Sequence, residues 1–133
     1  MSTSATGTRV LSSWDEEDFA KADGVKLTRS AIAYRYEGDI EGEAVQEYVM
    51  FYRADDTNTF VGMEQVTGRI GGRSGSFVLQ HTGELTGETA TVTWHVVKGS
   101  GTGELAGLTG SGGFTATHEE GGNASYRLEY SFE

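Results

Sequence analysis

Glycine-rich turns divide this chain into short segments in which apolar and polar side chains alternate. The clearest segment is Ala124–Phe132, where Tyr126, Leu128 and Tyr130 fall on one face of an extended chain and polar side chains on the other. The chain has 20 Gly and no Pro, and it shows neither heptads nor alternating strand and helix patterns. A two-residue period interrupted by turn residues is typical of antiparallel strands joined by hairpins. We therefore expect an all-β protein.

The alternation predicts eight consecutive strands in one domain. A first strand at Thr8–Ser13 is followed by Asp15–Gly24, which is compatible with a helical turn, an ordered loop or an irregular strand. A meander of this kind leaves two free edges, and closure into a barrel removes both of them. We predict a closed antiparallel eight-stranded meander barrel in residues 8–133 after a flexible N-terminus at residues 1–7, with a two-sheet sandwich as the alternative. The other expected strands are Val25–Tyr36, Glu43–Tyr52, Thr59–Thr67, Ser74–Thr82, Glu88–Val97, Phe114–His118 and Ala124–Phe132.

Charge and composition exclude several classes of function. The formal net charge of −10 repels phosphate backbones and anionic membrane surfaces, so we expect neither nucleic-acid nor membrane binding. Cysteine is absent, which excludes disulfides, thiolate metal sites and a cysteine nucleophile. The first ten residues lack the apolar core of a signal peptide, and no apolar run is long enough to span a bilayer. These features predict a soluble, cytoplasmic protein.

The strand pattern also predicts which side chains face the interior. When the more apolar face of each strand is placed inside, Glu47, Glu64 and His81 all point inward. The alternative for the third strand places Tyr48 and its same-face neighbours Met50 and Tyr52 inside and sends Glu47 to solvent, since a slip of one residue reverses the faces. We prefer the first arrangement. It leaves Tyr48, Met50 and Tyr52 as an exposed apolar stripe, which predicts a homo-oligomer formed through this face.

The inward polar residues are candidates for chemistry. Carboxylates inside a small barrel lose hydration, which favours their protonated form unless a partner compensates. A neighbouring His81 would hold one of Glu47 and Glu64 ionised while the other stays protonated, so the three residues are candidate catalytic groups. The alternative is a buried Glu–His or Glu–Arg pair that satisfies itself, with Arg29 or Arg35 as possible partners. Candidate ligand-binding residues are Phe60, Phe77, Leu79, Trp94, Phe114, His118, Tyr126 and Tyr130.

No metal site or cofactor is expected. His81, His118 and a glutamate are suitable ligand types, but no His-x-His or His-x-x-x-His pair pre-forms a site. The segment Lys98–Gly103 lacks the order of a phosphate-binding loop and no helix follows it. Glycines at the corners of a bending barrel account for this segment.

Several motifs resemble one known family. They include GRSGSFVLQHTGEL, GSGTGELAGLTGSGGFTA, SSWDE, GDIEGE and FVGMEQVTG, and together with the segments between them they extend from about Gly7 to Phe132. The chain resembles the bacterial DUF3224 family, a domain of unknown function. The resemblance implies an allene-oxide-cyclase-like β-barrel, similar in appearance to calycin and lipocalin barrels. Plant allene oxide cyclases and dirigent proteins guide ring closure or radical coupling inside such barrels, but the resemblance supplies no catalytic residues.

Three hypotheses for the function follow. The first is a barrel that binds one small hydrophobic, partly polar ligand in its interior. The second is a cofactor-independent isomerase or cyclase that uses Glu47, Glu64 and His81 for proton transfer. The third is a ligand-free barrel that associates with itself or a partner. An interior cavity with a mouth favours the first, and a filled interior with an apolar exterior favours the third.

Overall fold

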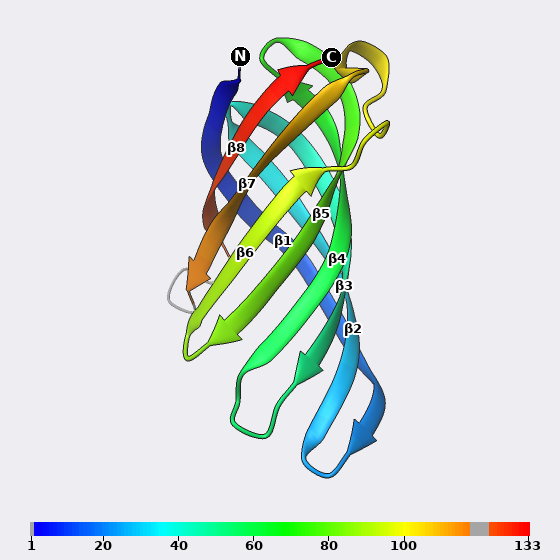
Figure 1. Cartoon of the computed structure of the whole chain (residues 1–133), viewed down its shortest axis with the longest axis vertical. Helices are drawn as coiled ribbons and strands as arrows, with labels where there is room; N and C mark the ends of the chain where they lie inside the picture. The colour runs from blue at the N-terminus through cyan, green and yellow to red at the C-terminus, as the bar shows by residue number, and fades with distance from the viewer. Residues whose placement is uncertain (1, 118–122) are drawn as a thin grey trace.

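The chain forms a closed antiparallel barrel of eight strands, which confirms the predicted fold class (Figure 1). The computed structural model describes residues 2–117 and 123–133. Each strand pairs with its neighbours in the sequence, and β8 returns to pair with β1. Among the described residues, no helix is long and apolar enough to cross a membrane. The elements are β1 Thr3–Ala22, β2 Val25–Gly38, β3 Ile40–Tyr52, β4 Asn58–Ile70, β5 Arg73–Thr86, β6 Thr89–Val96, the short 3-10 helix η1 Gly103–Leu105, β7 Leu108–Thr117 and β8 Ala124–Phe132.

Strand β1 is much longer than its alternation predicts. It continues through Asp15–Ala22 as an irregular strand, one of the three conformations left open for this segment. Its register against β2 shifts twice, between Leu11 and Ser13 and between Asp18 and Ala20. Each bulge moves the side chains to the opposite face, so the apolar period is interrupted in the sequence. The strand also includes residues 3–7, predicted as a flexible end, because Thr3–Gly7 pair with β8.

Turn chemistry fixes the hairpin at the end of β1. Asp23 and Gly24 connect β1 to β2 with φ values of +41° and +85°. Two consecutive left-handed residues match the twist of the flanking strands, and Asp-Gly is a favoured pair for this turn. This hairpin extends beyond the others at one end of the barrel (Figure 1).

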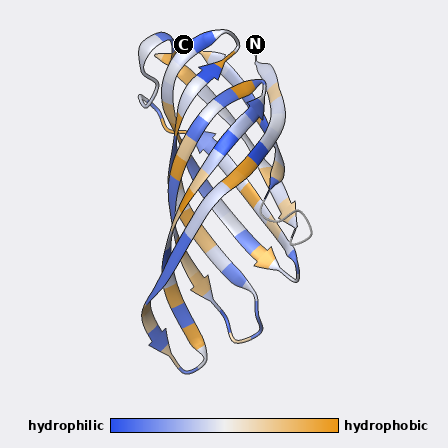
Figure 2. Ribbon diagram, turned by 180° about the vertical axis from the view of Figure 1, so that it is seen from behind, coloured by the Kyte–Doolittle hydropathy of each residue, from blue (hydrophilic) through white to orange (hydrophobic). Residues whose placement is uncertain are grey.

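The register stacks the inner side chains in layers along the barrel axis. Colours alternate between hydrophilic and hydrophobic along most strands, as expected when one face is buried (Figure 2). Starting from the end with the β1–β2 hairpin, the first layer is Lys26, Tyr52, Asn58 and Leu85; the second is Thr28, Met50, Phe60, Gly83 and Val92; the third is Ser30, Tyr48, Gly62, His81 and Trp94; and the fourth is Ile32, Gln46, Glu64, Leu79 and Val96.

The prediction for the faces of β3 is wrong. Tyr48 and Met50 are 4% and 5% exposed inside the barrel, Tyr52 is half-buried at its end, and Glu47 is exposed on the outside. The alternative that the sequence left open is therefore the observed arrangement. The error has a physical cause: the outer row of β3 carries Val45 and other exposed apolar side chains, so apolar content does not identify the inner face. The stripe predicted as an oligomer interface thus belongs to the interior, whereas self-association itself remains a prediction.

Candidate functional site

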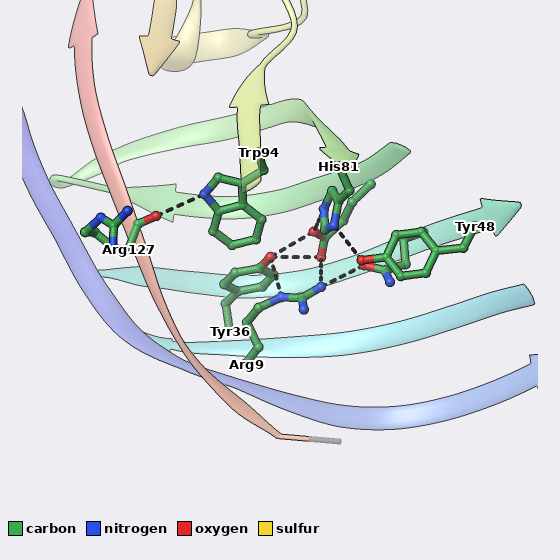
Figure 3. A network of polar contacts seen from close by, with 8 residues as sticks. Arg9, Tyr36, Tyr48, His81, Trp94 and Arg127 are labelled. Atoms are coloured by element: carbon green, nitrogen blue, oxygen red, sulfur yellow. Dashed lines mark hydrogen bonds and ion pairs between the residues drawn. The ribbon is translucent and has the colours of Figure 1, made fainter. Parts of the chain in front are cut away.

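A charged cluster lies at the centre of the barrel and includes His81 of the third layer and Glu64 of the fourth (Figure 3). Glu64 enters from β4, His81 from β5, Tyr36 from β2 and Arg9 from β1. The side chains of Arg9, Glu64 and His81 are fully buried. Four strands far apart in the sequence therefore bring one acid, two bases and a phenol together away from water.

Glu64 is the acceptor at the centre of this cluster. Arg9 Nη2 donates to its Oε2 at 3.1 Å, and the Tyr36 hydroxyl lies 2.9 Å from both carboxylate oxygens. His81 Nε2 lies 2.8 Å from Oε1. Arg9 also donates from Nε to the Tyr36 hydroxyl at 2.9 Å and from Nη2 to Gln46 Oε1 at 2.7 Å. These bonds replace the hydration that the buried carboxylate loses.

The protonation states follow from burial and charge. Burial alone would raise the pKa of Glu64, but the charge of Arg9 and hydrogen bonds from His81 and Tyr36 lower that pKa below its ordinary value. Burial likewise would lower the pKa of Arg9, but the charge of Glu64 raises it. Burial lowers the pKa of His81 more than the hydrogen bond and charge of Glu64 raise it. At neutral pH the cluster therefore holds an ionised Arg9–Glu64 pair and a neutral His81.

This charge state assigns the tautomer of His81. Since Glu64 is ionised, His81 Nε2 carries the proton and donates it, which leaves Nδ1 as an acceptor. The Tyr48 hydroxyl lies 2.7 Å from Nδ1 and donates to it. Burial raises the pKa of Tyr48, so its hydroxyl keeps its proton. Tyr48, His81 and Glu64 thus form a directed chain of hydrogen bonds, which we call the relay, with the phenol at its outer end.

Aromatic rings enclose the cluster. The Arg9 guanidinium carbon lies 3.9 Å from the ring centroid of Tyr34 and 4.1 Å from that of Phe114, so the cation is stacked between two rings. The rings of His81 and Trp94 meet edge to face at 5.3 Å. Arg9 Nη1 is buried and has no hydrogen-bond partner among the described residues.

A second feature is a cleft of about 700 Å³ at the end of the barrel, which we call the end cleft. Asn58 in its lining is 2% exposed, and its Oδ1 accepts no hydrogen bond from any residue that the structure describes. Tyr52 donates to Glu16 Oε2 at 2.5 Å at the side of the cleft, and Thr28 donates to the same oxygen at 2.7 Å. The lining residues are Asp18, Lys21, Ala22, Asp23, Gly24, Val25, Lys26, Tyr52, Arg53, Asp56, Asn58 and Leu85.

The structure brings together only part of the predicted catalytic set. Glu64 and His81 are in direct contact, whereas Glu47 lies on the outside of β3, so the expectation that it shares their pocket is wrong. Arg29 and Arg35 are exposed, and the ion-pair partner of Glu64 is Arg9. Within the described part of the chain, no group of three or more His, Cys, Asp or Glu is placed to hold a metal ion. His118 lies outside the described residues. The other residues predicted to bind a ligand, all of them buried, are Phe60, Phe77, Leu79, Trp94, Phe114, Tyr126 and Tyr130.

Sequence reasoning missed four members of the cluster: Arg9, Tyr36, Gln46 and Tyr48. One signal for Arg9 was available, because it alternates with Thr8 and Val10 and so shares a face with Ala5, which is fully buried. In the sequence, Tyr36 and Tyr48 are indistinguishable from ordinary aromatic core or surface residues. Only the register places the Tyr36 hydroxyl beside Glu64 and the Tyr48 hydroxyl beside His81.

Fold and site together define a small closed antiparallel barrel with a buried charged and aromatic cluster at its centre. The model of the family described as a protein of unknown function (DUF3224) matches residues 5–130, and the chain belongs to this family. It is similar to the crystal structure of a protein of unknown function from the DUF3224 family of Shewanella oneidensis MR-1. The TM-score is 0.79 at 30% sequence identity, over 100% of this chain and 99% of that chain. A search of the curated proteins finds no match.

Proposed function

We propose that the barrel binds one small, largely apolar ligand through its end cleft, with a hydrogen-bond donor of the ligand directed at Asn58. The observation that carries this proposal is Asn58 Oδ1, a buried acceptor without a partner in the lining of a 700 Å³ cleft. A buried acceptor left unpaired costs about 1–3 kcal/mol. A ligand donor would remove this cost, and a cleft of this volume is in the range of small-molecule sites.

The layer beneath the cleft forms an apolar floor just outside the lining of the cleft. Met50 and Phe60, 5% and 4% exposed, form the layer directly below Tyr52 and Asn58. Phe60 packs over Gly83 on the neighbouring strand β5, where any side chain would collide with its ring. Met50 is flexible and polarizable, and such side chains adapt to ligands of different shape. The floor therefore suits an apolar ring or chain.

Native mass spectrometry of the protein purified from its host tests this proposal, because it detects a co-purifying molecule. We expect a bound small molecule with the parent chain and its loss with Asn58→Leu, which keeps a side chain branched at Cγ but has no acceptor. Since the substitution also removes the unpaired buried acceptor, its unfolding free energy is expected to stay equal or rise.

Thr93→Leu, on the outer face of β6, is the matched control and should retain the ligand. A parent chain without bound mass, together with no NMR shift at Asn58 or Leu85 in a fragment screen, would overturn the proposal. So would an Asn58→Leu variant that keeps its ligand.

The relay supports a second candidate, a cofactor-independent proton transfer such as an isomerisation or cyclisation. Tyr48 lies one layer below Met50, so its hydroxyl is the member of the relay nearest the cleft. Its proton points to His81 Nδ1, and Glu64 orients the opposite edge of that ring. A ligand that displaced Met50 would meet a phenol already paired with a base. Glu47 takes no part in this candidate.

Tyr48→Phe separates catalysis from binding. The variant keeps the ring and removes the hydroxyl, so a proton-transfer role predicts that ligand is retained while deuterium exchange into it from heavy water is lost. Equal exchange rates in the parent and the variant would exclude the relay as the proton donor or acceptor.

A further inference from the structure

The outer face of β3 and β4 carries a continuous set of large apolar side chains, which we call the outer stripe. Its members are 37–63% exposed and project away from the core, so they contribute little to the interior packing. Contiguous apolar surface of this kind is characteristic of protein interfaces. The outer stripe consists of Val45, Val49, Phe51, Val61 and Met63.

The outer stripe borders a shallow groove of about 620 Å³ on the outside of the barrel. On the groove's β2 side the side chains are small, with Ala31 beside Glu47 and Ala33 beside Val45. On its other side Met63 is larger and 53% exposed. A groove of small residues next to a ridge of large ones can dock on its own copy, because a two-fold axis places each ridge opposite the other groove.

The charges on this face are also self-complementary. Glu47 lies within the apolar surface. Arg29 lies on the neighbouring strand β2, two residues from the position that pairs with Glu47. Among the described residues neither side chain forms an ion pair, and Arg29 makes only a cation–π contact with Phe19, at 5.9 Å. In a two-fold interface, Arg29 of each copy opposite Glu47 of the other would pair all four charges.

We propose that the outer stripe and its groove bind a second copy of this chain in an isologous dimer. A spacing of ~4.8 Å between neighbouring strands makes the face from β1 to β5 about 19 Å wide. A rise of ~3.3 Å per residue makes it about 20 Å long along the strands. This footprint is roughly half of the ~800 Å² that each partner buries in a standard interface, so the dimer is expected to be weak, with a micromolar Kd. The net charge of −10 also opposes association.

Sedimentation velocity from about 1 to 300 μM, a range that brackets the expected Kd, tests this proposal. We expect a concentration-dependent dimer, and a Kd at least ten-fold weaker for Met63→Lys. Thr91→Lys, which adds the same charge on the outer face of β6, is the matched control and should leave Kd within three-fold of the parent.

Charge reversal tests the pairing itself. Glu47→Arg and Arg29→Glu should each weaken the dimer, and the double variant should recover it to within three-fold of the parent. A parent chain that stays monomeric at the highest concentration overturns the proposal and leaves the face to a different protein. A dimer that Met63→Lys does not weaken overturns it as well.

Discussion

The two faces of strands β3 and β4 differ most clearly near the middle of the barrel. The inner face carries Gln46, Tyr48 and Glu64 at the centre of the barrel, all buried and hydrogen-bonded. The outer face carries Val45 and Met63, 63% and 53% exposed. Around the central cluster these strands thus place polar and aromatic side chains inside and aliphatic side chains outside.

The inner and outer side chains of these strands are therefore held in place by different interactions. Inside, specificity comes from matched hydrogen bonds, because each polar group around Glu64 must meet its partner or lose free energy. Outside, aliphatic side chains satisfy strand propensity without fixing any contact. A substitution that conserves shape but removes polarity should therefore have large effects inside and small effects outside.

The largest expected effect is on the charged pair. Glu64→Gln removes the negative charge and leaves Arg9 ionised and buried, so we expect the free energy of unfolding to fall by about 3–5 kcal/mol. Glu43→Gln, the same change on the exposed outer face of β3, should stay within about 0.5 kcal/mol of the parent. Urea denaturation of both variants measures the difference.

A double variant sharpens this result. Arg9→Met combined with Glu64→Gln removes both charges and should recover most of the lost stability, because a buried ion pair is often replaceable by neutral groups. If Glu64→Gln alone costs no more than Glu43→Gln, the central cluster does not hold an ionised pair.

The sequence alone predicts the barrel well because strand register and turns are local. The alternation finds β8 with its bounds unchanged, and β2 to β6 within a few residues. It fails where local signals are interrupted, at the two bulges of β1 and in the glycine-rich start of β7, where Gly110 and Gly112 have no side chain to show a period. These are positions at which pairing across the sheet decides the conformation.

The candidate site is predicted less completely, for a different reason. Glu64 and His81 are found because polar residues on apolar faces stand out. Arg9 is 55 residues from Glu64 in the chain, and no local pattern connects them. Glu47 is placed on the wrong face because the outer side of β3 is apolar enough to resemble an inner one.

The next largest effect on stability is expected for Val→Thr on the inner face of β4. The same substitution on the outer face of the neighbouring strand β3 serves as the comparison. Val66→Thr on β4 places a hydroxyl in the fully buried interior and should cost about 2 kcal/mol. Val45→Thr on β3 places the same hydroxyl in solvent and should change stability by less than about 0.5 kcal/mol. Thermal unfolding at sub-micromolar protein concentration measures both without self-association. Equal losses would mean that the outer stripe supports the fold.

The smallest effect is the response to acid. Because the pKa of His81 is lowered in the folded protein, the unfolded chain takes up a proton first, below its ordinary pKa of 6.5. Stability from His81 is therefore complete above pH 6.5 and decreases as the pH falls below it. The lowered pKa of Glu64 acts in the same direction, below its ordinary value of 4.5. Urea denaturation at several pH values should show this slope in the parent and in His95→Gln, which changes an exposed histidine on β6, and a flatter one in His81→Gln. A parent slope unchanged by His81→Gln would mean that folding does not lower the pKa of His81.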